Sequence, residues 1–239
     1  MMLGTLLNAV AILVGGGLGI LFGDRLSAQT RQTVIYGLGL FIIASGLQMF
    51  LKTQNALLVL GSLLLGGLIG EGLQIQARLE GLGAWLEARV QRNGSAAETA
   101  RFIKGFVSSS LLFCIGPMAI LGSIQAGLEG NITILAIKST LDGFASLAFA
   151  ATLGVGVLFA SLPILLYQGS ITLLAGWAQH ILSAAMINEL TATGGLLIMA
   201  IGISGLLELK PVRLGNFLPA LLLAPLFVAG LAMLPSLAK

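Results

Sequence analysis

The chain alternates between long hydrophobic runs and short polar connections. The runs reach roughly 18 residues or more, which is the length that an α-helix needs to cross about 30 Å of hydrocarbon. We therefore predict an all-α fold, a single polytopic membrane domain with about eight transmembrane helices. The predicted spans cover residues 3–23, 33–51, 56–74, 105–127, 132–161, 164–183, 190–208 and 216–235.

The distribution of charge supports this class and predicts an orientation. Only 9% of the 239 residues are charged, whereas a soluble domain carries about 25%, so membrane lipid is an expected partner. Most of the basic residues fall in connections on one side of the predicted membrane, and only Lys52 and Lys239 lie on the other. The first group comprises Arg25, Arg31, Arg78, Arg89, Arg92, Arg101, Lys104, Lys210 and Arg213. The positive-inside rule then predicts a bacterial cytoplasmic membrane protein with both termini outside, and the basic excess requires no nucleic-acid partner.

The longest polar segment, residues 75–101, has the pattern of an amphipathic helix on the inner membrane face. Leu79, Leu82, Leu86 and other apolar residues recur at helical spacing between charges. Asn93-Gly94 is expected to end this helix, and Ser95 with Glu98 is expected to form a capping box that starts the next one. The segment serves as a surface connector or, alternatively, as a regulatory or partner-binding element.

Two parts of the chain resemble each other and predict an internal repeat. The segment "GLFIIASGLQMFLK" (39–52) aligns without gaps to "GLLIMAIGISGLLE" (195–208), and 60–69 aligns to 218–227. A weaker match pairs 6–16 with 166–176 and places Asn8 opposite Gln168. Because five spans separate the two starts, the repeats are expected to be inverted in the membrane, as in many secondary transporters.

This organisation divides the chain into four parts. The division gives a first repeat (1–74), the connector (75–101), central helices (102–162) and a second repeat (163–239). Asn8 is expected a little inside the outer surface and Gln168 a little inside the inner surface, related by the pseudo-twofold axis. Glycine-rich faces at 15–19 and 66–70 are typical of close helix contacts, either within the chain or between the copies of a homodimer.

The central helices hold the residues that are most unusual for a membrane span. Lys138 and Asp142 lie four residues apart on one face of the fifth span, with Ser139 and Thr140 beside them. A charge at the bilayer centre costs roughly 2.5–3.5 kcal/mol on insertion scales, so such residues normally face the protein interior and mark function. We predict a substrate or ion site here, and a purely structural ion pair is the alternative.

The fourth span is expected to break at Gly116-Pro117. Proline removes a backbone donor and clashes with the preceding turn, and a broken helix at membrane depth is tolerated only against protein or a water-filled cavity. Gln125 follows one helical segment later. The predicted binding site therefore comprises Lys138, Asp142, Gln125, Asn8, Gln168, Ser139 and Thr140, next to a helix break at Gly116 and Pro117. The fifth span is long enough to be tilted or to break near Gly143.

These motifs carry a family resemblance over almost the whole length. The segments "GTLLNAVAILVGGGLG", "CIGPMAILGSIQAGLEG", "LAIKSTLDGFASLAFAATLGVGV" and "YQGSITLLAG" are similar to those of bacterial inner-membrane proteins of the family called domain of unknown function 554. The resemblance implies a multi-span membrane protein, often described as a possible transporter. It supplies neither a substrate nor assigned site residues.

The sequence favours a secondary transporter of a small polar metabolite or ion that works by alternating access. The alternatives are an ion channel or leak pathway, and a non-transporting membrane scaffold or sensor. An enzyme is not expected because the chain contains no recognisable nucleophile–base motif, phosphate loop or metal motif. With one histidine and one cysteine, no cofactor and no metal site are expected.

Overall fold

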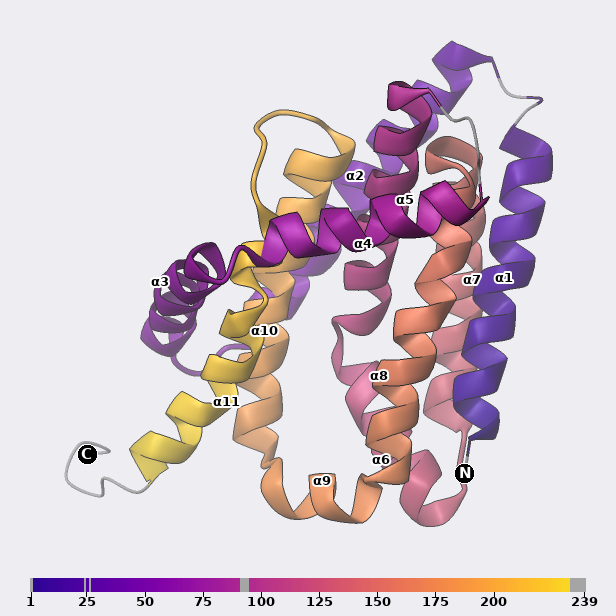
Figure 1. Cartoon of the computed structure of the whole chain (residues 1–239). Coiled ribbons are helices and arrows are strands. Elements are labelled where there is room, and N and C mark those ends of the chain that lie inside the picture. Colours follow the sequence, from indigo (N-terminus) through magenta and orange to yellow (C-terminus); the bar gives the residue numbers. More distant parts are fainter. Residues whose placement is uncertain (1, 24, 26, 91–94, 233–239) are drawn as a thin grey trace.

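The structure, a computed structural model, describes residues 2–23, 25, 27–90 and 95–232 (Figure 1). Within these ranges the chain is helical and contains no strand. The α-helices are α1 (Leu3–Gly23), α2 (Ala28–Phe50), α3 (Ala56–Gly72), α4 (Ile75–Val90), α5 (Ala96–Cys114), α6 (Pro117–Glu129), α7 (Thr133–Leu153), α8 (Ser161–Leu173), α9 (Ala175–Ile181), α10 (Ala184–Ala200) and α11 (Pro219–Ala232). Shorter helical segments are η1 (Val155–Ala160), the π-helix η2 (Ile201–Leu206) and η3 (Leu214–Phe217).

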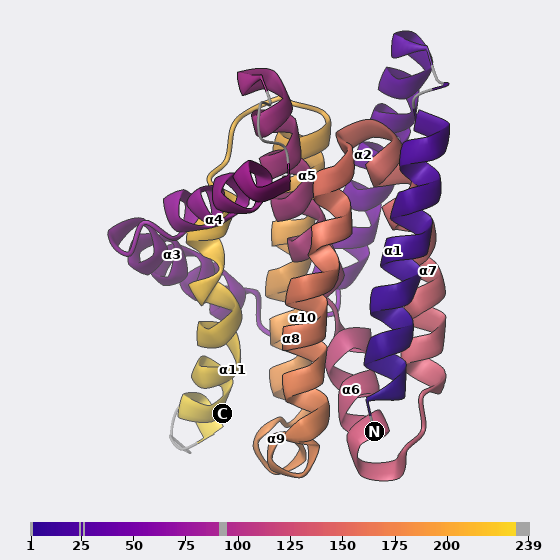
Figure 2. The same cartoon turned by 45° about the vertical axis from the view of Figure 1, so that its right-hand side comes forward.

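The helices confirm the predicted class of polytopic α-helical membrane protein. Six helical segments of the described chain are long and apolar enough to cross a membrane, and two bent pairs raise the number to eight. One pair joins α3 to α4 with a bend of 59°, and the other joins α5 to α6 with a bend of 60°. The helix predicted for the connector is also present as α4, which lies across the bundle in Figures 1 and 2.

The break predicted at Gly116-Pro117 is present. Helix α5 ends at Cys114, Ile115 and Gly116 are extended, and α6 begins with Pro117 in its first turn. Proline suits that position because a first-turn N–H has no partner within a helix. At the other end of α5, the Ser95–Glu98 capping box forms as predicted, whereas Asn93 and Gly94 lie outside the described residues.

The boundary between the fifth and sixth spans was predicted incorrectly. Helix α7 continues without interruption through Gly143 and ends at Leu153, not near residue 161. Gly154, with φ +81°, turns the chain, because glycine adopts positive φ at little cost. The sixth span therefore starts at Val155 and ends at Leu173, and the separate helix α9 follows it. The apolar run on both sides of Gly154 concealed this boundary in the sequence.

Two groups of helices make up the bundle. Helices α1, α6, α7 and α8 pack against one another, and α2, α3, α10 and α11 form the second group. Helix α5 contacts α7 and α8 of the first group, and it contacts η2, which continues α10. The start of α1 and the end of α11 lie at the same end of the bundle, whereas the end of α1 and the start of α2 lie at the opposite end (Figure 1).

Candidate functional site

Four polar side chains from three helices meet inside the first group of helices. Asn8 comes from α1, Lys138 and Asp142 come from α7, and Gln168 comes from α8. Asn8 and Gln168 are fully buried, while Lys138 and Asp142 are 6% and 9% exposed. We call these four residues the polar cluster.

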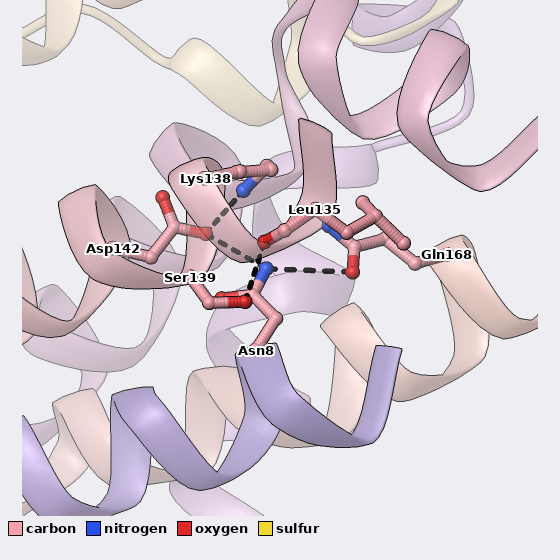
Figure 3. Close-up of polar contacts among 6 residues, drawn as sticks. All are labelled: Asn8, Leu135, Lys138, Ser139, Asp142 and Gln168. Atoms are coloured by element: carbon pink, nitrogen blue, oxygen red, sulfur yellow. Dashed lines mark hydrogen bonds and ion pairs between the residues drawn. The ribbon is translucent and has the colours of Figure 1, made fainter. Parts of the chain in front are cut away.

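Hydrogen bonds connect all members of the polar cluster (Figure 3). Lys138 Nζ forms an ion pair with Asp142 Oδ2, and Asn8 Nδ2 donates to the same oxygen at 2.9 Å. Asn8 Nδ2 also donates to Gln168 Oε1 at 3.4 Å. An ionised Asp142 carboxylate can only accept hydrogen bonds, so the Asn8 amide must turn its NH₂ group toward it. With the Asn8 NH₂ group in this place, the Gln168 amide must turn its carbonyl oxygen toward Asn8.

This orientation leaves hydrogen-bonding capacity unused. Asn8 Oδ1 and Gln168 Nε2 are buried and have no partner among the described residues. A buried polar group without a partner costs about 1–3 kcal/mol, so such atoms require an explanation. The cluster therefore has one acceptor and one donor that are buried and unpaired among the described residues.

Close packing of α1 on α7 sets the position of Asn8 beside the ion pair. Glycines of α1 lie directly on backbone carbonyls of α7, where a Cβ would overlap them. The distances from such a Cβ would be 2.1 Å at Gly15 to Gly143 O, 2.2 Å at Gly19 to Leu147 O and 2.6 Å at Gly23 to Ala151 O. The glycine-rich face predicted at 15–19 therefore packs within the chain. One turn beyond the cluster, Ser146 Oγ donates to Ile12 O at 2.8 Å and joins the same two helices.

The two amides lie side by side and not near opposite surfaces as the sequence alignment predicted. Asn8 is five residues from the start of α1, and Gln168 is five residues from the end of α8. Both ends lie at the same end of the bundle (Figure 1). The error follows from the misplaced boundary. The sixth span starts at Val155 and not at residue 164, so Gln168 lies near the end of this span and not near its start.

The other predicted site residues take different positions. Ser139 is buried beside the cluster, and its hydroxyl donates to Leu135 O at 2.6 Å in its own helix. Thr140 is exposed on the opposite side of α7 and donates to Ala136 O, so it does not join the cluster. Gln125 Nε2 donates to Glu129 at 3.4 Å, and none of its described contacts reaches the cluster.

Apolar side chains lie on one side of the polar cluster. Ile12 and Ile164 lie one helical turn from Asn8 and Gln168, respectively, on the side away from the start of α1, and both are fully buried. They pack in one cluster with Phe113 of α5. On the other side, the hydroxyls of Thr5 and Thr172 lie 3.5 Å apart. The cluster is thus sealed by hydrocarbon toward one end of the bundle and approaches polar groups toward the other.

Sequence reasoning missed a second buried acid, Glu189 on α10. Its Oε2 accepts from Thr53 Oγ1 at 2.6 Å, and its Oε1 accepts from the backbone N–H groups of Gln54 and Asn55 at 2.8 and 3.2 Å. The side chain is 3% exposed. These contacts tie the α2–α3 connection to α10, which gives Glu189 a structural role.

Replacing Glu189 with glutamine is expected to lower the free energy of unfolding by about 1–2 kcal/mol, because the bonds to a charged acceptor become weaker neutral bonds. SDS-induced unfolding in mild detergent would measure the change, with Glu129→Gln, a substitution at an exposed helix end, as the control. Equal stability of both variants would contradict the structural role.

Metal-ligand side chains do not gather in the described part of the chain: no group of three or more His, Cys, Asp or Glu residues could hold an ion there. The polar cluster combines one base, one acid and two amides. Such a set suits recognition of a small molecule or ion by hydrogen bonds and charge.

The fold and the cluster together define a multi-pass α-helical membrane protein with a buried polar site. The family model described as protein of unknown function (DUF554) matches residues 3–229, and the chain belongs to this family. It is 31% identical to "Uncharacterized membrane protein YdfK" of Bacillus subtilis (strain 168), over 95% of this chain and 96% of that protein. It is 32% identical to "Uncharacterized protein YqgA" of Escherichia coli (strain K12), over 94% of this chain and 95% of that protein. No solved structure matches the chain.

Proposed function

We propose that this protein is a secondary transporter of a small polar metabolite or ion across the bacterial cytoplasmic membrane, and that the polar cluster binds the substrate. The observation that carries the proposal is the unused hydrogen-bonding capacity of Asn8 Oδ1 and Gln168 Nε2 next to the buried ion pair. Ionisable residues inside a membrane are expensive and normally line substrate or ion pathways. A bound polar molecule would satisfy both free atoms.

The break between α5 and α6 supports this proposal. The N-cap residue of α6, Gly116, forms no side-chain cap; Pro117 has no N–H, and the N–H of Ala119 donates to Gly116 O at 3.2 Å. Secondary transporters commonly place such half-helix ends at their substrate sites. The break also gives α6 a direction independent of α5, which a rocking movement requires.

The apolar seal formed by Ile12, Phe113 and Ile164 supports a carrier over a permanently open pore. A carrier exposes its site to one side at a time, so one side must be closed in each state. Hydrocarbon without polar partners is an effective barrier to ions and polar solutes.

An inverted repeat is supported by reciprocal contacts between α2 and the continuous segment α10–η2. The sequence alignment pairs Gly39 with Gly195, and Gly46 with Gly202. Gly46 lies against Gly195, and Gly39 lies against Gly202, so the twofold operation converts one contact into the other. The alignment of Asn8 with Gln168 does not follow this axis, because both residues lie near the same end of the bundle.

The basic residues support the orientation with both termini outside. In Figure 1 the end of α1, the start of α5 and the loop before η3 lie at the end opposite the start of α1. Arg25 follows α1 in the sequence, and the other two segments carry Arg101, Lys104, Lys210 and Arg213. By the positive-inside rule, this concentration of basic residues supports a cytoplasmic position for this end.

Gln168→Leu provides the test. The substitution removes the free donor at nearly constant volume, and it also removes the acceptor that lies 3.4 Å from Asn8 Nδ2. Asn8 Nδ2 keeps its 2.9 Å bond to Asp142, so the expected cost is that of one weak hydrogen bond, about 1 kcal/mol. We expect the thermal midpoint to stay within a few degrees, and proteoliposome uptake of radiolabelled L-amino acids or short monocarboxylates to fall at least about tenfold. Thr140→Val, on the exposed face of α7, is the control and should transport normally.

Uptake by Gln168→Leu at the wild-type rate would contradict the assigned site. Flux that does not saturate and shows no counterflow would support a channel in place of a carrier. A wild-type protein that moves none of these solutes would leave the scaffold or sensor role as the better account.

A further inference from the structure

One face of α4 combines two arginines with two large apolar side chains. Arg78, Leu82, Trp85 and Arg89 follow one another at helical spacing, which places them within an arc of about 60° around the helix axis. All four side chains are exposed, and the exposed fractions of Leu82 and Trp85 are 47% and 51%. We call these four residues the α4 stripe.

The acidic residues of α4 lie on the opposite side of the helix. Glu80 and Glu87 are about half a turn away from the α4 stripe. Gln76 Nε2 donates to Glu80 Oε1 at 2.7 Å, and Glu87 is 6% exposed. Within the described part of the chain, neither Arg78 nor Arg89 forms an ion pair with a carboxylate. The stripe therefore presents two positive charges that no acid of the described chain neutralises.

Two residues of the α4 stripe also contact each other. The guanidinium carbon of Arg89 lies 4.2 Å from the centroid of the Trp85 ring, which is a cation–π contact. A guanidinium can bind a phosphate group through two parallel hydrogen bonds. Tryptophan is enriched at the level of the head groups in membrane proteins. The pair therefore combines a binding group for phosphate with a side chain that suits the membrane interface.

The α4 stripe adjoins a surface that faces hydrocarbon. An apolar groove lies between α5, α8, α10 and α11, and its lining includes Leu79 and Leu82 of α4 and Cys114 at the end of α5. Leu166 and Leu222 in this groove belong to membrane spans and are 72% and 70% exposed, so the groove opens toward lipid tails. Helix α4 crosses the bundle in the half that contains the end of α1 (Figures 1 and 2). Because Leu82 belongs to both surfaces, the stripe lies beside the edge of the hydrocarbon.

We propose that the α4 stripe binds anionic phospholipids of the cytoplasmic leaflet. Arg78 and Arg89 contact the lipid phosphates, and Leu82 and Trp85 insert at the level of the glycerol groups. Each basic residue near an anionic leaflet contributes about fivefold in affinity. A zwitterionic head group has no net charge, so it gains much less from the same arginines. This site is separate from the polar cluster and does not depend on the transport function.

The test uses brominated lipids, which quench tryptophan fluorescence on contact. The chain has two tryptophans, so Trp177→Phe leaves Trp85 as the reporter in the full protein. This protein is placed in nanodiscs of phosphatidylcholine with a minor fraction of phosphatidylglycerol, and bromine is carried on the acyl chains of the phosphatidylglycerol or of an equal amount of the phosphatidylcholine. Brominated phosphatidylglycerol is expected to quench Trp85 at least about twice as strongly. Added salt should reduce this difference, because it screens the charges.

Variants of the two arginines separate their charge from a structural role. Arg78→Gln/Arg89→Gln should bring the ratio of the two quenching values close to one. Arg78→Lys/Arg89→Lys should keep a clear preference for phosphatidylglycerol, because an anionic leaflet attracts either cation. Lys52→Gln, which removes an exposed positive charge from a connection assigned to the outside, is the matched control and should behave as the parent protein. All variants should have the thermal midpoint of the parent protein in pure phosphatidylcholine, since the substituted positions are exposed.

Equal quenching of Trp85 by the two lipids would overturn the proposal, because the stripe would then contact lipid without regard to charge. An unchanged preference in Arg78→Gln/Arg89→Gln would overturn it as well, because the arginines would not be the groups that bind. If neither lipid quenched Trp85, the stripe would face water, and a soluble protein partner would replace the lipid as its occupant.

Discussion

Lys138→Met is expected to lower the free energy of unfolding by about 3–5 kcal/mol. The substitution leaves the Asp142 carboxylate buried without its cation, and breaking a buried ion pair from one side costs this much. Asp142→Leu should be similarly harmful, because it leaves the ammonium of Lys138 unpaired. SDS-induced unfolding or thermal unfolding in mild detergent would measure both losses.

The double variant Lys138→Met/Asp142→Leu separates the structural role of this pair from its functional role. Replacing both partners of a buried pair with apolar residues of similar volume is often neutral or stabilising. We therefore expect the double variant to regain most of the stability lost in the single variants. If the cluster is a binding site, the double variant should fold and still fail to take up or bind substrate.

Two outcomes would contradict this account. A double variant as unstable as the single variants would mean that the surrounding hydrogen bonds, including that from Asn8 Nδ2, need the charges. A stable double variant with normal transport would reduce Lys138 and Asp142 to a structural ion pair, which the sequence left as the alternative. Thr140→Ala, on the exposed face of the same helix, is the control for both measurements.

Gly15→Ala is expected to destabilise the protein by about 1–3 kcal/mol, the range for inserting atoms into a well-packed core. A Cβ at Gly15 would lie 2.1 Å from Gly143 O, so α1 must move away from α7. This movement would also carry Asn8 away from Asp142 and should reduce transport. A bulkier Gly15→Leu should have a larger effect on both.

Gly17→Ala is the matched control two residues along the same helix. A Cβ at Gly17 would have no neighbour within 4 Å. Because alanine is favoured over glycine inside a helix by roughly 0.5–1 kcal/mol, this variant should be as stable as wild type or slightly more stable. If Gly15→Ala and Gly17→Ala behaved alike, the close contact between α1 and α7 would not be what positions Asn8.

The residues of the polar cluster were predictable to different degrees. Lys138 and Asp142 are conspicuous because charges are rare in apolar runs and their spacing puts them on one helical face. Asn8 and Gln168 were selected from a weak alignment that placed them near opposite surfaces, and their hydrogen bond contradicts that placement. Glu189 escaped notice because it precedes a long apolar run, where an acid is usually solvated; its burial depends on the α2–α3 connection.

The sequence by itself determined the class of protein, the number of apolar runs, the helix break and the charged pair. These features depend on composition and local rules, such as the length of hydrocarbon to be crossed and the missing N–H of Pro117. Only the tertiary structure decided that α1 packs on α7, that Gln168 meets Asn8, and that the groove lies beside Cys114. Hydrophobicity does not distinguish a neighbouring helix from lipid, so helix pairing follows from close contacts between small residues and from buried hydrogen bonds.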